Sequence, residues 1–286
     1  MKTQSSFRSS NSNGSLFLVP TPIGNLEDMT FRAINCLKES DLIAAEDTRN
    51  TRKLLNHFDI HTPMESFHEH NVREKIPELI NYLKEGKSIA QVSDAGMPSI
   101  SDPGHELVLA VIEEDIPVIS LPGASAGITA LIASGLAPQP HTFYGFLARK
   151  KTEQVRFFES RKADLGTQIF YESPLRVAKT LNNMLEVYKD REIVVVRELT
   201  KIYEEYRRGK ITEILEDLEN HPLKGECLIL VSEASEVLEE YEDTALEAIK
   251  KLISQGEKTN VAIKTIAKAR QLNRQELYHQ FHDIKD

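Results

Sequence analysis

The sequence predicts an α/β protein made of two α/β domains with a small helical bundle at the C-terminal end. Three observations support this fold class. In the first half, short apolar runs alternate with helical patterns, which is typical of a mostly parallel sheet covered by helices. A second series of apolar runs follows two closely spaced prolines, Pro138 and Pro140. From residue 244 onward only short helical patterns occur.

The apolar runs of the first half are rich in Val, Ile and Leu, and they predict strands at 16–20, 42–46, 88–92 and 116–120. Between them, patterns bounded by Gly, Pro or polar residues predict helices near 27–38, 72–84, 104–114 and 124–135. The second series predicts strands at 143–146, 168–171, 192–197, 204–209 and 227–231. We therefore expect an N-terminal α/β domain at 15–137 and a second α/β domain at 138–233.

Composition excludes several classes of protein. The chain has 286 residues, of which 40% are hydrophobic and 28% charged, as in ordinary globular proteins. No stretch approaches the roughly 18 consecutive apolar residues of a membrane span, so no membrane association is expected. The first fourteen residues are rich in Ser and Asn and lack the apolar segment of a secretory signal, which predicts a disordered tail at 1–14. Cys36 and Cys227 form neither a disulfide framework nor a metal-type spacing, so a cytoplasmic location is expected.

Charge is distributed unevenly. The formal net charge of −9 argues against a general nucleic-acid coat protein, which would need many Lys and Arg to neutralise phosphates. An acidic run ends at Asp243, and the segment after it is rich in basic residues, among them Lys250, Lys251, Lys258, Lys264, Lys268, Arg270 and Arg274. This asymmetry predicts an acidic linker at 234–243 and a separate module at 244–286.

The C-terminal module is expected to form three short helices. The first ends at Gly256, the second starts at Thr259 or Asn260, and the third opens with Asn273 and Glu276 in a capping-box-like spacing. Three small helices with a basic stripe resemble a helix-turn-helix bundle, which would bind RNA. A helical tail used for packing or dimerisation is the alternative.

Glycine and proline cluster directly after three of the predicted strands, at 21–25, 93–104 and 121–126. Ligands of open α/β sheets bind outside the carboxyl ends of the strands, so these loops are expected to line one pocket. The alternative is that they are only tight turns. Neither GxGxxG nor GxxxxGK[ST] is present, which argues against a dinucleotide fold and a P-loop enzyme.

Charged clusters also follow two strands, at 46–49 and 197–201, although ion pairs at strand ends are often only structural. The segment Phe67-His68-Glu69-His70-Asn71 invites a metal interpretation. No Cys or third His lies at a zinc-type spacing from it, so a structural or RNA-contacting role is favoured and no metal is expected. Nucleophilic catalysis is not supported, because there is no GxSxG motif and neither Cys lies beside a His.

Together these segments resemble a known family. The motifs are LVPTPIGNLED (18–28), AEDTR (45–49), SDAGMPSISDPG (93–104), LPGASA (121–126), YESP (171–174) and RELTK (197–201). In this order they resemble the ribosomal RNA small subunit methyltransferase I family of the tetrapyrrole-methylase superfamily, over residues 16 to about 233. Two departures are visible: Pro20 stands where a small residue is expected, and Ala124 where many relatives have Pro.

The resemblance implies a tetrapyrrole-methylase-like fold, with S-adenosylmethionine (SAM) in the cleft between two α/β domains. It implies 2′-O-methylation of a cytidine ribose in the decoding region of 16S rRNA, on the small ribosomal subunit, by a homodimer. Carried over by motif, the cofactor-binding residues are Pro22, Asp94, Gly96, Ser99, Ile100, Ser125, Ala126, Phe146, Leu147, Tyr171 and Thr200.

Methyl transfer to a hydroxyl requires alignment of the two reacting atoms, and a base that accepts the proton late in the reaction can assist it. Glu46 and Asp47 are candidate bases, and Arg49 and Lys201 are candidates for holding phosphate or lowering the pKa of the hydroxyl. Alternatively, these residues orient loops and RNA while water takes the proton. Two other functions remain open: a tetrapyrrole methyltransferase of the same fold, and a non-catalytic nucleic-acid-binding regulator that uses residues 244–286.

Overall fold

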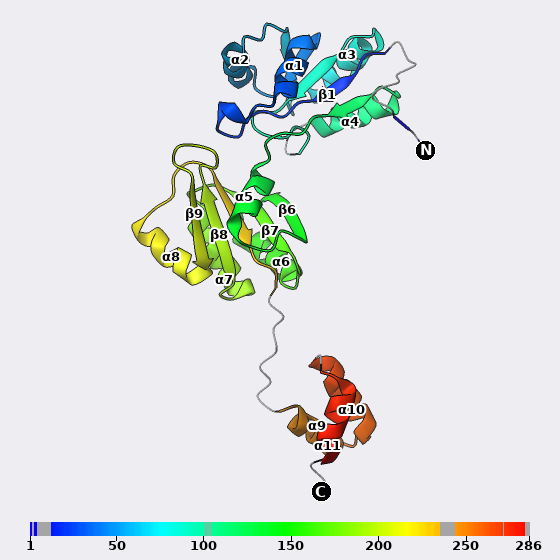
Figure 1. Cartoon of the computed structure of the whole chain (residues 1–286), viewed down its shortest axis with the longest axis vertical. Coiled ribbons are helices and arrows are strands. Elements are labelled where there is room, and N and C mark those ends of the chain that lie inside the picture. Colours follow the sequence, from blue (N-terminus) through cyan, green and yellow to red (C-terminus); the bar gives the residue numbers. More distant parts are fainter. Residues whose placement is uncertain are drawn as a thin grey trace. The chain divides into compact units, whose positions relative to one another are not determined.

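The computed structural model describes residues 1, 3–4, 13–100, 102, 104–234, 244–270 and 272–283. The chain divides into two compact units, residues 1–233 and 234–286, and each is described by itself (Figure 1). The predicted disordered tail (1–14) and acidic linker (234–243) fall largely outside the described residues.

The first unit begins with a five-stranded parallel sheet in the order β3-β2-β4-β1-β5. Its strands are β1 (Leu16–Leu18), β2 (Leu42–Ala45), β3 (Met64–Ser66), β4 (Ile89–Val92) and β5 (Val118–Ser120). Four of them confirm the predicted strands, whereas the sequence pattern does not predict β3. All residues of β2 and β4 are buried, which explains why they are almost entirely apolar, with Gln91 the one polar residue in these two strands.

Helices cover both faces of this sheet. They are the 3-10 helix η1 (Leu26–Asp28) and the α-helices α1 (Phe31–Glu39), α2 (Thr48–His57), α3 (Val72–Lys84) and α4 (Gly104–Glu113). Side chains of α1 and α2, such as Leu37 and Leu55, pack into one apolar cluster with β1, β2 and β4. Side chains of α3 and α4, such as Leu83 and Leu107, pack into a second cluster on the other face. The helix predicted near 27–38 is in fact η1 followed by α1, and α2 is a helix that the sequence pattern does not predict.

The second sheet of this unit has the order β6-β7-β10-β8-β9. Its strands are β6 (His141–Phe146), β7 (Thr167–Glu172), β8 (Glu192–Arg197), β9 (Glu205–Lys210) and β10 (Cys227–Val231). Strands β6 and β7 pair in parallel, and the other neighbouring pairs are antiparallel. The second domain is thus mixed rather than parallel.

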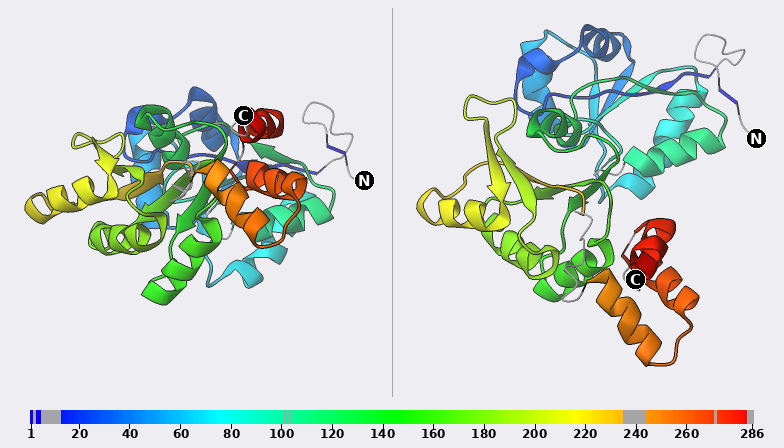
Figure 2. Two further views of the ribbon diagram at one scale, coloured as in Figure 1. Left: turned by 90° about the horizontal axis from the view of Figure 1, so that it is seen from below. Right: turned by 60° about the horizontal axis from the view of Figure 1, so that its bottom comes forward.

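Alternating residues of β8 show how this sheet is covered. Ile193 and Val195 pack with α6 (Lys151–Arg161), α7 (Val177–Tyr188) and α8 (Ile211–Asn220) on one face. Val194 and Val196 pack on the other face with α5 (Ala126–Ser134). Helix α5 therefore packs on the second sheet, although the predicted boundary at 137/138 places it in the N-terminal domain. Figure 1 labels α5 beside β7, and Figure 2 gives two further views of the same elements.

The described part of the second unit contains three helices: α9 (Ala245–Ser254), α10 (Thr259–Ala269) and α11 (Arg274–Asp283). They share a small core that includes Ile249, Ile263, Leu277 and Phe281. The predicted start of the second helix at Thr259 is confirmed. So is the predicted cap of the third helix, because Asn273 Oδ1 accepts a hydrogen bond of 2.9 Å from the backbone N–H of Gln275.

Candidate functional site

The loops that follow β1 and β4 are held together by backbone hydrogen bonds. Thr21 and Gly96 exchange two N–H···O bonds of 3.0 Å each, and Thr21 Oγ1 donates to the carbonyl of Ser93 at 3.2 Å. Gly96 adopts a φ of +78°, and a Cβ there would lie 3.2 Å from Cγ2 of Ile23. The close approach of the two loops thus requires glycine at this position.

The 93–104 loop is organised around the carboxylate of Asp102. Its oxygens accept hydrogen bonds from the backbone N–H of Ser99 at 2.7 Å and of Gly104 at 2.8 Å. The buried side chain of Gln91 donates a third, at 3.1 Å. Ser99 has a φ of +67°, a conformation that costs free energy for a residue with a Cβ. The Asp102 contacts hold the loop in this shape.

These loops border a cavity of about 620 Å³, here called the apolar cavity. The first sheet contributes Ile23, residues 93–97, Ile100 and Asp102, and the loop after β5 contributes Ser125 and Ala126. The three glycine- and proline-rich loops therefore line one pocket, as predicted. The second sheet contributes Phe146, Tyr171, Glu172, Leu199 and residues 225–228. Although they line a cavity, Ile100 and Phe146 are 63% and 68% exposed, so the cavity presents apolar surface that a ligand would cover.

A tight turn after β8 supports the second-sheet side of this cavity. Glu198 and Thr200 have positive φ angles of 49° and 67°. Glu198 Oε1 accepts from the backbone N–H of Glu226 at 2.9 Å, and Lys201 Nζ donates to Glu198 and Glu226 at 2.9 Å each. A Cβ on Gly225 would overlap Glu198, so glycine is required where this turn meets the cavity wall.

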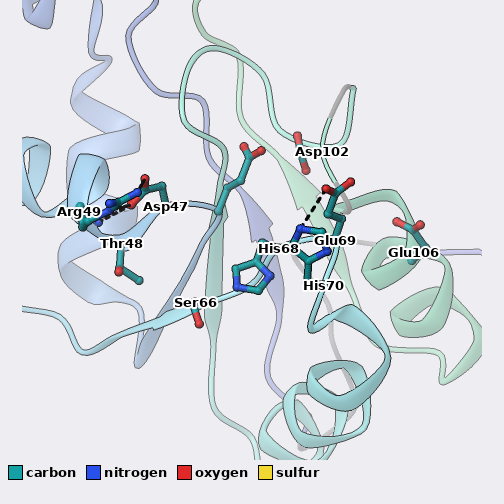
Figure 3. Close-up of a pocket in the computed structure, with 10 residues that line it drawn as sticks. Asp47, Thr48, Arg49, Ser66, His68, Glu69, His70, Asp102 and Glu106 are labelled. Carbon is teal, nitrogen blue, oxygen red and sulfur yellow. Dashed lines mark hydrogen bonds and ion pairs between the residues drawn. The ribbon is translucent and has the colours of Figure 1, made fainter.

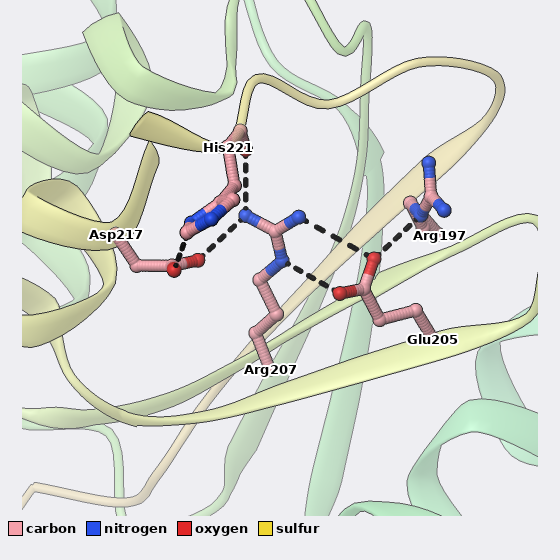
Figure 4. Close-up of polar contacts among 5 residues, drawn as sticks. All are labelled: Arg197, Glu205, Arg207, Asp217 and His221. Atoms are coloured by element: carbon pink, nitrogen blue, oxygen red, sulfur yellow. Dashed lines mark hydrogen bonds and ion pairs between the residues drawn. The ribbon is translucent and has the colours of Figure 1, made fainter. Parts of the chain in front are cut away.

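A network of charged side chains fixes the strands that carry this turn (Figure 4). Arg207, with a side chain only 12% exposed, pairs with Glu205 at 3.2 Å and with Asp217 of α8 at 2.7 Å. The other oxygen of Glu205 lies 2.6 Å from Nε of Arg197, the last residue of β8. His221 also binds Asp217, through Nδ1 at 2.8 Å. The network ties β8, β9 and α8 together behind the turn.

A second cavity of about 610 Å³, here called the polar cavity, adjoins the first (Figure 3). It lies at the carboxyl ends of β2, β3 and β4 and shares Glu46 and Asp102 with the apolar cavity. Its other lining residues are Asp47, Thr48, Arg49, Ser66, residues 68–70 and Glu106. Five of these ten residues are carboxylates and one is arginine, so the cavity is acidic.

The two neighbouring carboxylates Glu46 and Asp47 have opposite electrostatic environments. Burial is the main cause that raises the pKa of Glu46. It outweighs the opposite effect of a hydrogen bond of 3.1 Å, which Glu46 Oε2 accepts from the backbone N–H of Asp94 and which lowers the pKa. The pKa of Asp47 is lowered to about 2, chiefly by the hydrogen bonds from Arg49. At neutral pH Asp47 is held as a carboxylate by its pair, whereas Glu46 takes up a proton more readily than an ordinary glutamate.

Comparisons with known proteins agree with this arrangement. The family model described as Tetrapyrrole (Corrin/Porphyrin) Methylases matches residues 15–215, which include most of both sheets and most of the cavity lining. The chain belongs to the tetrapyrrole methylase family. The predicted fold class is thereby confirmed.

Relatives within the family are similar over their full length. The chain is 63% identical to a protein of Streptococcus pyogenes serotype M1 named ribosomal RNA small subunit methyltransferase I, over 99% of this chain and all of that one. It is 48% identical to a protein of the same name from Bacillus subtilis, over 99% of both chains. A solved structure of uroporphyrin-III C-methyltransferase from Thermus thermophilus, complexed with S-adenyl homocysteine, shares the fold with a TM-score of 0.53 and 20% identity; the match covers 77% of this chain and 98% of that one.

The structure brings most of the predicted site residues of this family member to the two cavities. Glu46, Asp47 and Arg49 line the polar cavity. Seven of the predicted cofactor-binding residues line the apolar cavity: Asp94, Gly96, Ile100, Ser125, Ala126, Phe146 and Tyr171. Their roles remain predictions.

Five predicted residues line neither cavity. Pro22 and Ser99 lie within the loops, and the side chain of Leu147 packs into the core on one face of the second sheet. Thr200 lies near Gly24 of the first loop, and Lys201 is engaged by Glu198 and Glu226. The geometry gives Lys201 two structural partners and lends no support to its predicted catalytic role.

Residues without a predicted role also line the cavities, among them Asp102, Glu106, Glu172 and Glu226. Asp102 and Glu172 belong to motifs that follow or end a strand, so their place in the sequence could have identified them as lining residues. Glu106 lies in the first turn of α4 and carries no such signal. Within the described residues, no group of three or more His, Cys, Asp or Glu is placed to hold a metal ion. No helix in the described part of the chain is long and apolar enough to cross a bilayer.

Proposed function

We propose that this methylase uses SAM to methylate the 2′-oxygen of a cytidine ribose in the decoding region of 16S rRNA, on the small ribosomal subunit. One observation carries the proposal. The apolar cavity is lined by the three glycine- and proline-rich loops and has a volume that suits a small molecule, and it shares the lining residues Glu46 and Asp102 with the polar cavity. The names of the full-length relatives support the substrate. The reaction would take place in the bacterial cytoplasm.

The apolar cavity has the properties that SAM requires. Its volume of about 620 Å³ lies within the roughly 300–1,000 Å³ of small-molecule sites. Phe146 and Tyr171 form an edge-on aromatic pair with ring centroids 5.4 Å apart, which suits an adenine ring. The charged residues among its described lining are all carboxylates, which favour a ligand with a cationic amine and sulfonium. The solved relative of the same fold that holds S-adenyl homocysteine also supports this choice.

When bound, SAM supplies an electrophilic methyl group on a positively charged sulfur. The residues of this chain would position the acceptor hydroxyl and take its proton. Glu46 suits the proton transfer because it lines both cavities and because burial raises its pKa toward the working pH. Asp47, with a pKa of about 2, is a much weaker base and instead caps α2.

Arg49 is proposed to contact RNA phosphate. Its side chain is 87% exposed at the polar cavity, and a guanidinium matches the geometry of a phosphate group. The basic helices of residues 244–286 are proposed to add RNA contacts of their own. The homodimer implied by the resemblance is part of the proposal; Ile132 of α5, 75% exposed, offers apolar surface that a second copy would cover.

The test is methyl transfer from tritiated SAM to purified small ribosomal subunits from a strain that lacks the corresponding gene. We expect the label on the 2′-oxygen of a single cytidine. Subunits that already carry the methyl group are the matched control and should take up no label. Label that appears only on an added tetrapyrrole, with none on ribosomal RNA, would contradict the proposal.

A further inference from the structure

Glu172, the last residue of β7, is a fully buried carboxylate that borders the apolar cavity. Its Oε1 accepts a hydrogen bond of 2.8 Å from the backbone N–H of Ser173 and lies 3.2 Å from Nε of Arg176. Its Oε2 accepts a hydrogen bond of 2.7 Å from the hydroxyl of Thr180, in α7. Because a buried charge is costly unless it is paired and hydrogen-bonded, these partners hold the carboxylate in one orientation. No step of the proposed methyl transfer uses Glu172.

Arg176 connects Glu172 to the loop that follows β6. While its Nε faces Glu172, its Nη2 donates hydrogen bonds to the carbonyl oxygens of Leu147 at 3.1 Å and of Ala148 at 3.0 Å. A guanidinium is a rigid planar fork, so the direction of one side of the group sets the direction of the other. The orientation that Glu172 gives to Arg176 therefore determines where residues 147 and 148 are held.

Buried amide side chains hold the same loop from helix α6. Gln154 Nε2 donates to the carbonyl of Ala148 at 2.8 Å, and Gln154 Oε1 accepts from Nδ2 of Asn183 at 2.7 Å. Gln154 Nε2 also lies 3.4 Å from the Thr180 hydroxyl that donates to Glu172. Gln154, Thr180 and Asn183 are each at most 3% exposed. A buried polar network with satisfied members specifies one arrangement, so the backbone after β6 has one defined position.

The loop after β6 begins directly behind Phe146, the last residue of that strand. Phe146 lines the apolar cavity but is 68% exposed, and its ring meets that of Tyr171 edge-on. Strand β6 lies at the edge of its sheet, and its pairing with β7 shifts register between Phe143 and Gly145. Little core packing restrains so exposed a ring, so its position depends on the backbone that the Arg176 contacts anchor.

We propose that Arg176, oriented by Glu172, is a positioning residue that sets the Phe146 ring against the adenine of bound SAM. Arg176 lies outside the lining of both cavities, so it acts through the carbonyls of residues 147 and 148 and not by contact with the cofactor. The inference rests on the proposed function, which places SAM in the apolar cavity, and extends it to the residues that shape the wall around the adenine.

The experiment measures binding of S-adenosylhomocysteine to the full chain by calorimetry, in a double-mutant cycle of Arg176→Lys and Phe146→Ala. Lysine keeps a positive charge beside the buried Glu172 but lacks the planar fork that reaches the two carbonyls. Stacking of a base on an aromatic ring is worth roughly 5-fold to 150-fold in affinity, so Phe146→Ala should weaken binding within this range. Arg176→Lys should weaken it by at least about threefold in the wild-type background and by less than about twofold when Phe146 is alanine.

Two further measurements separate positioning from a general effect on the fold. The loss caused by Arg176→Lys should also appear with 5′-methylthioadenosine, which keeps the adenine and lacks the amino-acid part of the cofactor. Arg191→Lys is the matched control, because Arg191 also donates to backbone carbonyls, those of Lys162 at 2.8 Å and Ser232 at 3.4 Å. Arg191 directly precedes β8, at the end away from the turn at 198–201. Whatever Arg191→Lys does to the melting temperature, affinity for S-adenosylhomocysteine should stay within about twofold of wild type.

Three results would overturn the inference: unchanged affinity in folded Arg176→Lys, the same loss with and without the Phe146 ring, or a loss that is absent with 5′-methylthioadenosine. Should Arg176→Lys fail to fold, Glu172→Gln combined with Arg176→Met removes both charges and takes its place in the cycle. Coupling between Arg176 and Phe146 without any label on ribosomal RNA would refute the proposed substrate and retain the inference. Wild-type protein that binds no S-adenosylhomocysteine would refute both.

Discussion

Asp47 and Arg49 form a closed pair at the start of α2. Asp47 accepts hydrogen bonds from Nε of Arg49 at 3.1 Å, from Nη2 at 2.8 Å and from the Arg49 backbone N–H at 2.8 Å. Because the pair holds the pKa of Asp47 at about 2, we expect Asp47 to serve as a helix cap and a partner for Arg49 rather than as the base.

The first prediction concerns this pair. Asp47→Asn keeps a side-chain oxygen for the helix cap, so SAM affinity should be unchanged and the single-turnover rate should fall by less than about tenfold. A much larger loss of rate with intact SAM binding would show that Asp47 takes part in the chemistry.

The same pair predicts a pH dependence of stability. The folded pKa of Asp47 is lowered, so its stabilising contribution is present above the ordinary aspartate pKa and is lost as the pH falls toward about 2. As the pH falls from about 5 to about 2, unfolding of the wild-type protein should respond to acid more steeply than unfolding of Asp47→Asn. Parallel curves for the two proteins would contradict the assignment.

Gly96 is predicted to be required for SAM binding. Gly96→Val places a branched side chain at a φ of +78° and against Ile23, which should abolish SAM binding in a folded protein. Gly135→Ala is the control, because Gly135 also has a positive φ of 89° but a Cβ there would meet no described atom within 4 Å. Calorimetry that finds unchanged SAM affinity in folded Gly96→Val would refute the role of this loop.

Pro20 and Gly123 are predicted to be coupled. A Cβ on Gly123 would overlap Cβ of Pro20, the position where the family resemblance leads us to expect a small residue. Gly123→Ala should therefore lower the free energy of unfolding by about 1–3 kcal/mol through overpacking. In the double variant with Pro20→Gly, which removes both Cβ and Cγ of Pro20, much of this loss should disappear. Denaturant titration of the four proteins measures the coupling, and strictly additive effects would rule it out.

The C-terminal unit is predicted to act separately from the SAM site. Among the described residues, the apolar clusters of the first unit contain no residue of the second, which has a core of its own. Ending the chain after Glu233 should leave SAM affinity intact and weaken binding to small ribosomal subunits. The slope of log K for subunit binding against log salt concentration should become less steep by roughly 0.7–0.9 for each phosphate contact that is lost. Lys258→Gln with Lys264→Gln in the full chain should produce a smaller change of the same sign. A truncated protein with wild-type salt dependence would place the RNA contacts on the first unit.

Much of the fold could be predicted because the buried strands β2 and β4 are almost entirely apolar and the loops carry glycine and proline. The three-residue strand β3 could not, because Met64 and Ser66 are only half-buried and leave little pattern. Helix α2 could not be predicted because most of its residues are polar, and only Thr51, Leu54 and Leu55 are buried.

The apolar cavity was predictable in outline, since its loops all follow strands that share a sheet edge. The polar cavity was not, because it joins residues of the loop after β2, the loop after β3 and the first turn of α4. The sequence around His68 suggests only a metal ligand, a structural role or an RNA contact, and its unpaired ring nitrogen is visible only in three dimensions. Likewise, the opposite pKa shifts of Glu46 and Asp47 depend on burial and partners that adjacent sequence positions do not reveal.

The decisive measurement is the pH profile of single-turnover methyl transfer by Glu46→Gln beside the wild-type protein, with SAM affinity measured on both. The glutamine amide would keep an oxygen for the Asp94 N–H, so SAM affinity should stay within about threefold, while the rate should fall by about 10²–10⁴-fold. The wild-type rate should rise with pH through an apparent pKa above the ordinary glutamate value, and that limb should be absent in the variant. A Glu46→Gln protein with a near wild-type rate and the same pH limb would contradict the assignment of Glu46 as the base at the junction of the two cavities.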